Sequence, residues 1–253
     1  MSELAGRTAL VTGGGNGLGR AMCRALSAEG VRVVAVGRTL GSLEETVAGL
    51  PGAGSAVVCD VAAPGSVAGL VERLGDERVS ILVNNAGVAG PVAPLVDVGP
   101  GEWDEVFAAN VRGTYLMCRV LLPAMIERGF GDVVNVASVS GKRPLARRSP
   151  YCASKMAVLG LTTTLAAEVG PLGVAVNSLS PGPVEGPRMA RNFRLEAERA
   201  GTTVERAEAE FVSRAALGRM VTEDEVGAAL VAMLSMPGLC AADIDLSAGM
   251  VGR

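Results

Sequence analysis

Short apolar runs alternate with longer amphipathic stretches along the whole chain. Each apolar run is bounded by Gly, Pro or Asp, a pattern that is typical of buried β-strands. The strands predicted in this way cover residues 8–11, 31–36, 56–59, 80–83, 133–136 and 174–179.

The amphipathic stretches between these strands carry apolar residues at helical spacing, as residues 18–29 illustrate. Ser42 with Glu45 has the spacing of a capping box and predicts a helix start. Thr222 with Glu225 repeats that spacing near the end of the chain. Further helices are expected over residues 103–126 and 153–169.

The repeated order of strand, helix and strand predicts an α/β fold. We expect a doubly wound parallel sheet with helices on both faces, in three αβα layers. No Pro/Gly/Ser-rich linker divides the chain, which favours a single domain over residues 1–253. In such sheets, ligands bind beyond the carboxyl ends of the strands, so residues that directly follow the strands are the candidates for function.

Composition narrows the possible partners of the chain. With 49% hydrophobic and 19% charged residues, it can bury a large core. The net charge of −3 argues against a broad nucleic-acid-binding face. No apolar run reaches the roughly 18 residues of a membrane helix, and the N-terminus lacks the pattern of a secretory signal. We therefore expect no nucleic-acid partner and no membrane partner.

The cysteines and histidines limit both the compartment and the chemistry. Five scattered cysteines without a CxxC pair are typical of a reducing compartment, so a cytoplasmic location is expected. The chain has no histidine, which excludes hydrolases of the Ser-His-Asp or Cys-His type and removes the commonest metal ligand. Acid/base chemistry near neutral pH must come from Tyr, Lys, Cys, Asp or Glu.

A glycine-rich stretch follows the first predicted strand and opens a predicted helix. Glycines permit positive φ angles and let the backbone approach a pyrophosphate closely. The helix that follows offers free N–H groups and the positive end of its dipole. The stretch therefore predicts a nucleotide phosphate site made of Gly13, Gly15, Asn16, Gly17, Leu18 and Gly19.

The TGxxxGxG pattern of residues 12–19 resembles that of the short-chain dehydrogenase/reductase family. Further landmarks of that family follow in the same order, so the resemblance covers nearly the whole chain. It implies a Rossmann-like fold and an NAD(P)-dependent oxidoreductase that acts on a small alcohol or carbonyl compound. These landmarks are Asp60-Val61, Asn84-Asn85-Ala86-Gly87, Asn110, Ser138, Tyr151-x-x-x-Lys155 and Pro181-Gly182.

The same resemblance implies which residues form the site, and it requires no metal. The implied catalytic residues are Asn110, Ser138, Tyr151 and Lys155. Besides the glycine-rich stretch, the expected cofactor contacts are Arg38, Asp60, Val61, Asn84, Ala86, Gly87, Tyr151, Lys155, Pro181, Gly182 and Val184.

The four implied catalytic residues, which we call the tetrad, are of types that suit proton transfer. Tyr151 and Lys155 lie four residues apart, so a helix places them on one face, about 6 Å apart along its axis. A nearby ammonium favours the ionised form of a phenol, as general acid/base catalysis needs. Ser138 follows a buried strand and can hold a substrate oxygen by a hydrogen bond. By resemblance, Asn110 holds a water in a proton relay that includes Lys155.

The end of the second strand bears on the choice of cofactor. NAD sites of this fold usually place an acidic residue there, on the ribose 2′-hydroxyl. Here the position holds Gly37, and Arg38 follows it. An arginine can bind a 2′-phosphate through charge-assisted hydrogen bonds. NADP(H) is therefore favoured, while NAD(H) stays possible.

The substrate side is less defined. Residues 183–214 are polar, helix-prone and long for a connection, and by resemblance they cover the substrate. Met189, Phe193 and Phe211 within them can form an apolar wall or simply pack the helices. Four basic residues after Ser138 either attract an anionic substrate, such as a carboxylate or an acyl thioester, or belong to a solvated loop. They are Lys142, Arg143, Arg147 and Arg148.

Several functions remain open at this point. An NAD-dependent alcohol dehydrogenase and a 3-oxoacyl thioester reductase compete with a reductase of small ketones. A non-catalytic nucleotide-binding regulator is disfavoured because the tetrad is complete. By resemblance, the chain forms a dimer or tetramer through the helices near residues 103–126 and 153–169, and the apolar residues 245–251 can join such an interface.

Overall fold

A single parallel β-sheet organises the molecule. The computed structural model describes residues 3–143 and 145–250, without the side chain of residue 188. Its sheet has seven strands in the order β3-β2-β1-β4-β5-β6-β7, all parallel to their neighbours. They are β1 (Thr8–Thr12), β2 (Arg32–Gly37), β3 (Gly54–Val58), β4 (Val79–Asn84), β5 (Gly131–Val136), β6 (Val174–Pro181) and β7 (Asp243–Leu246).

The six predicted strands are present, with ends shifted by a few residues at most. The seventh strand, β7, was not predicted; part of it falls in the segment expected to join an interface. It pairs only with β6, at the edge of the sheet, and its side chains are only partly buried. An edge strand with alternating acidic residues lacks the apolar run by which the other strands are predicted.

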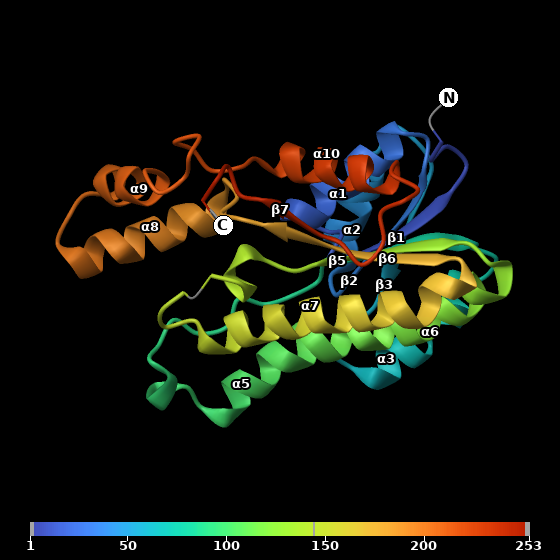
Figure 1. Ribbon diagram of the computed structural model, residues 1–253, viewed down its shortest axis with the longest axis horizontal. Coiled ribbons are helices and arrows are strands. Elements are labelled where there is room, and N and C mark those ends of the chain that lie inside the picture. The colour runs from blue at the N-terminus through green and yellow to red at the C-terminus, as the bar shows by residue number, and fades with distance from the viewer. Residues whose placement is uncertain (1–2, 144, 251–253) are drawn as a thin grey trace.

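Helices cover both faces of the sheet, which confirms the predicted three-layer fold (Figure 1). The helices α1 (Gly17–Ala28), α2 (Leu40–Ala48) and α10 (Glu223–Leu234) pack on one face. The other face carries α3 (Pro64–Ala68), α4 (Leu70–Leu74), α5 (Pro100–Phe107), α6 (Gly113–Arg128) and α7 (Ser149–Val169). No described helix is long and apolar enough to cross a membrane.

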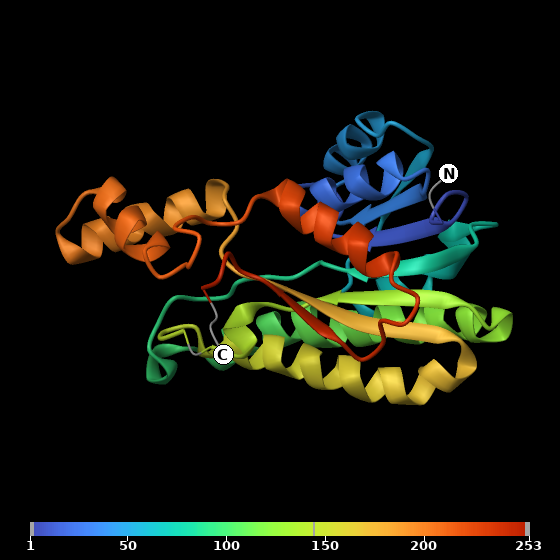
Figure 2. The same cartoon turned by 45° about the horizontal axis from the view of Figure 1, so that its top comes forward.

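Two helices project beyond the carboxyl ends of the strands (Figure 2). They are α8 (Pro187–Ala200) and α9 (Val204–Val212), and we call residues 187–212 the arm. A short parallel bridge between Val184 and Val221 closes the base of the arm. The arm has a small apolar cluster of its own, formed around Met189, Phe193 and Met220.

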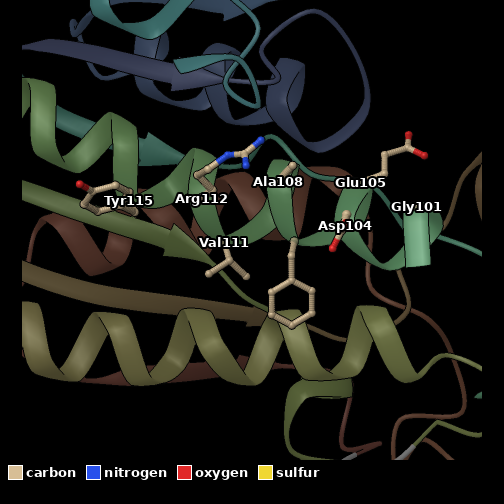
Figure 3. Close-up of a pocket in the computed structure, with 8 residues that line it drawn as sticks. Gly101, Asp104, Glu105, Ala108, Val111, Arg112 and Tyr115 are labelled. Carbon is tan, nitrogen blue, oxygen red and sulfur yellow. The ribbon is translucent and has the colours of Figure 1, made fainter. Parts of the chain in front are cut away.

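The helix predicted over residues 103–126 is interrupted. Residues Ala108–Arg112 form a π-helical turn between α5 and α6, and Figure 3 shows Ala108, Val111 and Arg112 on this stretch. A π turn adds a residue to the helical turn and often marks a functional position. Sequence periodicity does not reveal the insertion because apolar residues continue on both sides of it.

Of the two predicted capping boxes, one is confirmed and one is wrong. Glu225 N donates to Thr222 Oγ1 at 3.1 Å, and Thr222 N donates back to Glu225 Oε2 at 2.8 Å, so α10 begins as predicted. Helix α2 instead begins at Leu40, two residues before Ser42. The Ser42 hydroxyl donates to the carbonyl of Thr39, inside the first turn, rather than capping the helix.

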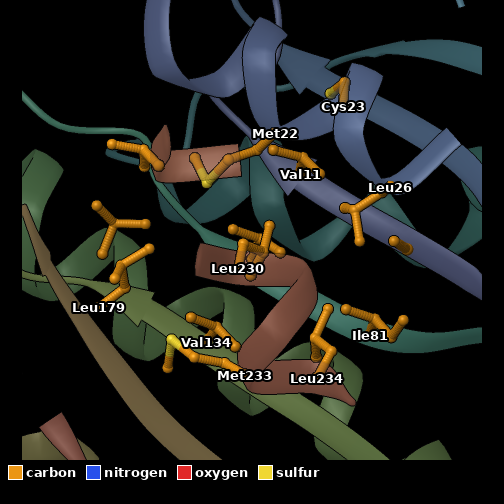
Figure 4. Close-up of a cluster of buried hydrophobic side chains, with 14 of the residues drawn as sticks. Val11, Met22, Cys23, Leu26, Ile81, Val134, Leu179, Leu230, Met233 and Leu234 are labelled. Carbon is orange, nitrogen blue, oxygen red and sulfur yellow. The ribbon is translucent and has the colours of Figure 1, made fainter. Parts of the chain in front are cut away.

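The larger core packs α1 and α10 against one face of the sheet (Figure 4). Met22 and Leu26 of α1 and Leu230 of α10 are fully buried there. Burial of each such side chain contributes roughly 1.5–3 kcal/mol. A Cβ at Gly227 would lie 2.9 Å from Ala25 Cβ, so the glycine allows the two helices to approach closely. This packing brings the start of α10 beside the glycine-rich loop.

Candidate active site

A pocket of about 700 Å³ opens at the carboxyl ends of the strands. The strand order reverses between β1 and β4, and the loops after both strands line the pocket. This is the position at which open α/β sheets bind their ligands. The predicted site residues that line it are Gly13, Asn16, Gly17, Leu18, Gly19, Ala86, Gly87, Ser138, Tyr151, Lys155, Pro181, Gly182 and Val184.

Two glycines of the glycine-rich loop, Gly13 and Gly19, leave no room for a side chain. Gly13 has a φ of +68°, and a Cβ there would lie 2.8 Å from Asn85 Nδ2. A Cβ at Gly19 would lie only 2.0 Å from the carbonyl oxygen of Gly13. The side chain of Asn16 makes no capping hydrogen bond at the start of α1. The loop is therefore a bare backbone cradle at a helix N-terminus, which suits a phosphate group.

Thr12 joins the loops that follow β1 and β4. Its Oγ1 accepts hydrogen bonds from the backbone N–H groups of Asn85, at 2.9 Å, and Ala86, at 3.0 Å. Asn85 Nδ2 donates back to the carbonyl of Thr12 at 2.9 Å. Asn85 lines the pocket, whereas the Asn84 side chain turns into the core and donates to Asn135 Oδ1 at 2.9 Å.

Tyr151 and Lys155 share one face of α7, as their spacing predicts. Lys155 Nζ lies 5.8 Å from the centre of the Tyr151 ring. The lysine is only 6% exposed, and its ammonium donates to the carbonyl of Val136 at 2.7 Å. Tyr151 is half-buried, and both side chains line the pocket. A phenol and a buried ammonium thus stand next to the bare loop.

Ser138 lies two residues after the end of β5 and is 7% exposed. Its Oγ accepts a hydrogen bond from Ser140 N at 3.2 Å. No acceptor for the hydroxyl proton of Ser138 is found among the described residues, so this proton is available for a ligand. The hydroxyl lies in the same pocket as Tyr151 and Lys155.

Asn110 lies in the π turn and is 1% exposed. Its Oδ1 accepts from Val88 N at 2.7 Å, and its Nδ2 donates to Val88 O at 3.0 Å and to Ser154 Oγ at 2.9 Å. A Cβ at Gly87 would lie 2.8 Å from Asn110 Oδ1 and 3.8 Å from Lys155 Nζ. Asn110 therefore fixes the loop after β4, and the glycine lets this loop pass close to both the amide and the ammonium.

Five other predicted cofactor contacts lie outside the pocket lining. Arg38 is exposed and directly follows β2. The end of β2 also holds the glycine-rich loop, because Gly14 N donates a hydrogen bond to Val36 O. Asp60 Oδ1 accepts from Ala62 N at 3.0 Å and shapes the turn after β3. The remaining three are Gly15, Val61 and Asn84.

Four charged residues that line the pocket are absent from the predicted site: Arg20, Arg24, Glu185 and Glu223. Glu223 Oε1 lies 3.6 Å from the Cβ positions of both Gly17 and Gly186, so it stands between the glycine-rich loop and the base of the arm. No motif identifies this glutamate, because only the packing of α10 on α1 brings it there.

The basic residues after Ser138 make contacts within the protein. Lys142 pairs with Asp243 and Asp245, and Arg143 donates to the carbonyl of Met250. Arg148 donates to Ala89 O at 3.2 Å, and Arg147 donates to Val92 O at 3.4 Å. Lys142 is thus paired with carboxylates, and none of the four basic residues lines the pocket, which removes the main reason to expect an anionic substrate.

Two of the buried cysteines, Cys23 and Cys118, take no part in this chemistry. Burial raises the pKa of Cys23 and of Cys118 to about 12 in each case. Both thiols therefore stay protonated near neutral pH, when only the thiolate is a good nucleophile.

Comparisons with known proteins point to one family. The family model of short chain dehydrogenases matches residues 7–198. The D-threitol dehydrogenase of Mycolicibacterium smegmatis is 40% identical over 184 residues, which span 71% of this chain and 70% of that protein.

Solved structures show the same similarity. The L-sorbose reductase of Gluconobacter frateurii, complexed with NADPH and L-sorbose, superposes with a TM-score of 0.92 at 25% identity, over 99% of this chain and 98% of the other. An NAD⁺-bound xylitol dehydrogenase superposes with a TM-score of 0.90 at 26% identity, over 98% of this chain and all of the other. The similar structures thus include both nicotinamide cofactors.

Proposed function

The chain belongs to the short chain dehydrogenase family and is an oxidoreductase acting on CH–OH groups, and we propose that it interconverts a small secondary alcohol and a ketone with NADP(H). One observation carries the proposal. Ser138, Tyr151 and Lys155 meet in the pocket that the bare glycine-rich loop also lines. A group that moves a proton thus stands beside a cradle for a dinucleotide.

The residues of the pocket fit a dinucleotide. Gly13 and Gly19 keep the loop free of side chains, and the N-terminus of α1 faces the space where a pyrophosphate would bind. Gly182, whose N–H donates to Leu246 O at 2.7 Å, borders the same pocket at the end of β6. When bound, the nicotinamide supplies the hydride chemistry.

In this proposal, each catalytic side chain has one task. Ser138 holds the carbonyl oxygen with its free hydroxyl proton. Tyr151 gives a proton to that oxygen in the reducing direction and takes it back in the oxidising direction. Lys155 favours the ionised form of Tyr151 through its buried charge. Asn110 keeps the loop at Gly87 in place beside Lys155 and leaves room for a water between them.

The preference for NADP(H) rests on Arg38. The end of β2 offers an exposed guanidinium and, at Gly37, no carboxylate that would repel a 2′-phosphate. A hydrogen bond to a charged group contributes about 1.5–3 kcal/mol, which corresponds to roughly a 10- to 100-fold difference in affinity. We therefore propose that NADPH binds more tightly than NADH, with NAD(H) as the alternative cofactor.

Parallel fluorescence titrations with NADPH and NADH test this preference. We expect the wild type to bind NADPH about 10- to 100-fold more tightly, and Arg38→Ala to lose most of that ratio by weakening NADPH binding alone. Arg194→Ala, which removes an exposed charge from the arm, serves as the control. Tighter NADH binding by the wild type would refute the assignment, while binding of neither cofactor would favour a non-catalytic protein.

None of the four basic residues after Ser138 lines the pocket, which supports a small uncharged substrate. Since Lys142 and Arg143 are engaged within the protein, we propose a polyol or simple ketone ahead of a 3-oxoacyl thioester. A panel separates these classes: oxidation of D-threitol and xylitol, and reduction of L-sorbose and of an acetoacetyl thioester. We propose further that residues 1–253 form one domain in which the arm covers the bound substrate.

The outer surface of α5 and α6 supports self-association. An open hollow of about 740 Å³ is lined there by Val111, Arg112 and Tyr115, among others (Figure 3). Tyr115 is 46% exposed, and Met156 on the adjacent α7 is 50% exposed. We propose that copies of the chain pair through these helices into a dimer or tetramer. The five unpaired cysteines support a cytoplasmic location.

A further inference from the structure

The turn that begins at Ser138 is held from one side by α7. Gly141 N donates to Ser138 O at 3.0 Å, and Lys142 N donates to Val139 O at 3.0 Å. A Cβ at Gly141 would lie 3.0 Å from the backbone carbon of Lys155. The turn therefore rests directly on the backbone of the catalytic helix, and any movement of the turn changes the position of Ser138 relative to that helix.

The same turn is held from the other side by β7. Lys142 Nζ donates to Asp243 Oδ2 at 2.5 Å and also to Asp245. The other oxygen of Asp243 accepts from Ser178 Oγ at 2.8 Å and from Ser180 Oγ at 2.7 Å. Both serines are buried on β6, so the carboxylate of Asp243 has a fixed position. Lys142 is thus tied to the sheet rather than to a mobile side chain.

The charge of Lys142 persists near neutral pH. Partial burial alone would lower the pKa of its amine, but the hydrogen bonds and charges of Asp243 and Asp245 outweigh burial and raise the pKa above its ordinary value. Lys142 does not line the pocket. Any influence on the reaction must therefore pass through the residues to which the turn connects it.

We propose that Lys142 is a positioning residue: by tying the turn of residues 138–141 to β7, it fixes the hydroxyl of Ser138 against Tyr151. This inference rests on the proposed function, in which Ser138 holds the substrate oxygen. The pairing links the catalytic turn to an edge strand that lies about a hundred residues away in the sequence. The edge strand β7 thereby becomes part of the support of the active site.

The first test compares Lys142→Met with Lys142→Arg. Methionine has a similar length but no charge, so the turn loses its ion pair with β7. We expect kcat to fall about 10- to 100-fold, which is the size of effect that a misplacement of about 1 Å produces. Arginine keeps the charge and should restore most of the rate. The Kd for NADPH should stay within about two-fold of wild type, because Lys142 is outside the pocket. The rate is measured with the panel substrate that the wild type turns over fastest.

Arg147→Met is the matched control, since it removes a positive charge from the same segment without breaking an ion pair. It should leave kcat within about two-fold of wild type. If Lys142→Met fails to fold, Asp245→Asn removes only one carboxylate of the pair and should give a smaller loss of kcat. Wild-type kcat in both Lys142→Met and Asp245→Asn would overturn the proposal.

A double-mutant cycle with Ser138→Ala shows whether Lys142 acts through Ser138. We expect Lys142→Met to cost little further activity once Ser138 lacks its hydroxyl. An equal loss in both backgrounds would overturn the positioning role of Lys142 while leaving the role of Ser138 intact. Full activity of Ser138→Ala would instead overturn the proposed role of Ser138, and the inference on Lys142 with it.

Discussion

Two regions of the molecule are held in place in different ways. One is the arm, and the other is the set of proposed catalytic residues at the carboxyl ends of the strands, which we call the catalytic edge. At the catalytic edge, Asn110 and Lys155 are almost fully buried and are bonded to the backbone of neighbouring elements. The arm projects from the sheet and packs around its own small cluster, in which the rings of Phe193 and Phe211 stand 5.4 Å apart (Figure 2).

This difference separates two requirements of the proposed reaction. Proton transfer needs groups held to within a fraction of an ångström, which the ends of the strands and α7 can provide. A cover over the substrate must open and close, and elements with few buried contacts do so at low cost in free energy. In the proposed reaction, the chemistry therefore lies on the large core and the substrate contacts lie on a smaller unit.

The largest expected effect comes from a substitution that changes the catalytic edge and leaves the arm intact. Tyr151→Phe removes the proton donor, and we expect turnover to fall about 10²- to 10⁴-fold. NADPH affinity and thermal stability should change little, because Tyr151 is only half-buried and its ring is retained. Steady-state kinetics and a fluorescence titration measure these two results.

The second tyrosine of the chain provides the control for this variant. Tyr115 is exposed on α6, so Tyr115→Phe should keep full activity. Turnover by Tyr151→Phe within a few-fold of wild type would show that another group moves the proton.

The next largest effect is expected from cavities in the large core on the sheet and in the apolar cluster of the arm. Leu230→Ala opens the main core, and we expect it to lower the free energy of unfolding by about 2–5 kcal/mol. Phe193→Ala should loosen the arm first, so global stability falls less while the KM for substrate rises. Denaturant unfolding and hydrogen exchange over residues 187–212 distinguish the two variants. Equal global destabilisation, with no faster exchange in the arm, would mean that arm and core unfold as one unit.

The smallest expected effect concerns the point where the chain returns from the arm. Arg219, with the backbone of Thr222, holds the pKa of Glu225 at about 2, below its usual value of 4.5. A carboxyl with a lowered pKa stabilises the fold above pH 4.5, and this contribution disappears as the pH falls towards 2. At pH values above 4.5, Glu225→Gln should therefore have a slightly lower melting temperature than the wild type. This difference in melting temperature should vanish near pH 2.

Asp224→Asn is the control for that measurement, since it removes a charge from the same turn of α10 but not the partner of Arg219. A difference between Glu225→Gln and wild type that stays constant with pH would contradict the ion-pair explanation.

Much of the fold and of the site was predictable from the sequence because the signals are local. Buried strands appear as apolar runs; the glycine-rich loop and Ser138 come just after two of them, and Pro181 is the last residue of a third. The four-residue spacing of Tyr151 and Lys155 needs only a helix to become a shared face. Membership of the family, which the motifs predicted, is confirmed by the match over residues 7–198.

Other features depend on contacts between distant parts of the chain. The π turn at Asn110, the edge strand β7 and the place of Glu223 beside Gly17 have no local signature. The basic segment after Ser138 is the clearest case. Its charges suggest a surface for anions until the pairing of Lys142 with β7 is known.

Most strands and helices and the family therefore follow from the sequence, which also predicts the reacting groups, since hydrophobic periodicity and residue spacing are properties of short segments. Which side chains share the pocket, and which charges are already paired, becomes known from the folded molecule alone. Burial and pairing depend on how the helices pack on the sheet, because this packing brings together residues that lie far apart along the chain, such as Lys142 and Asp245.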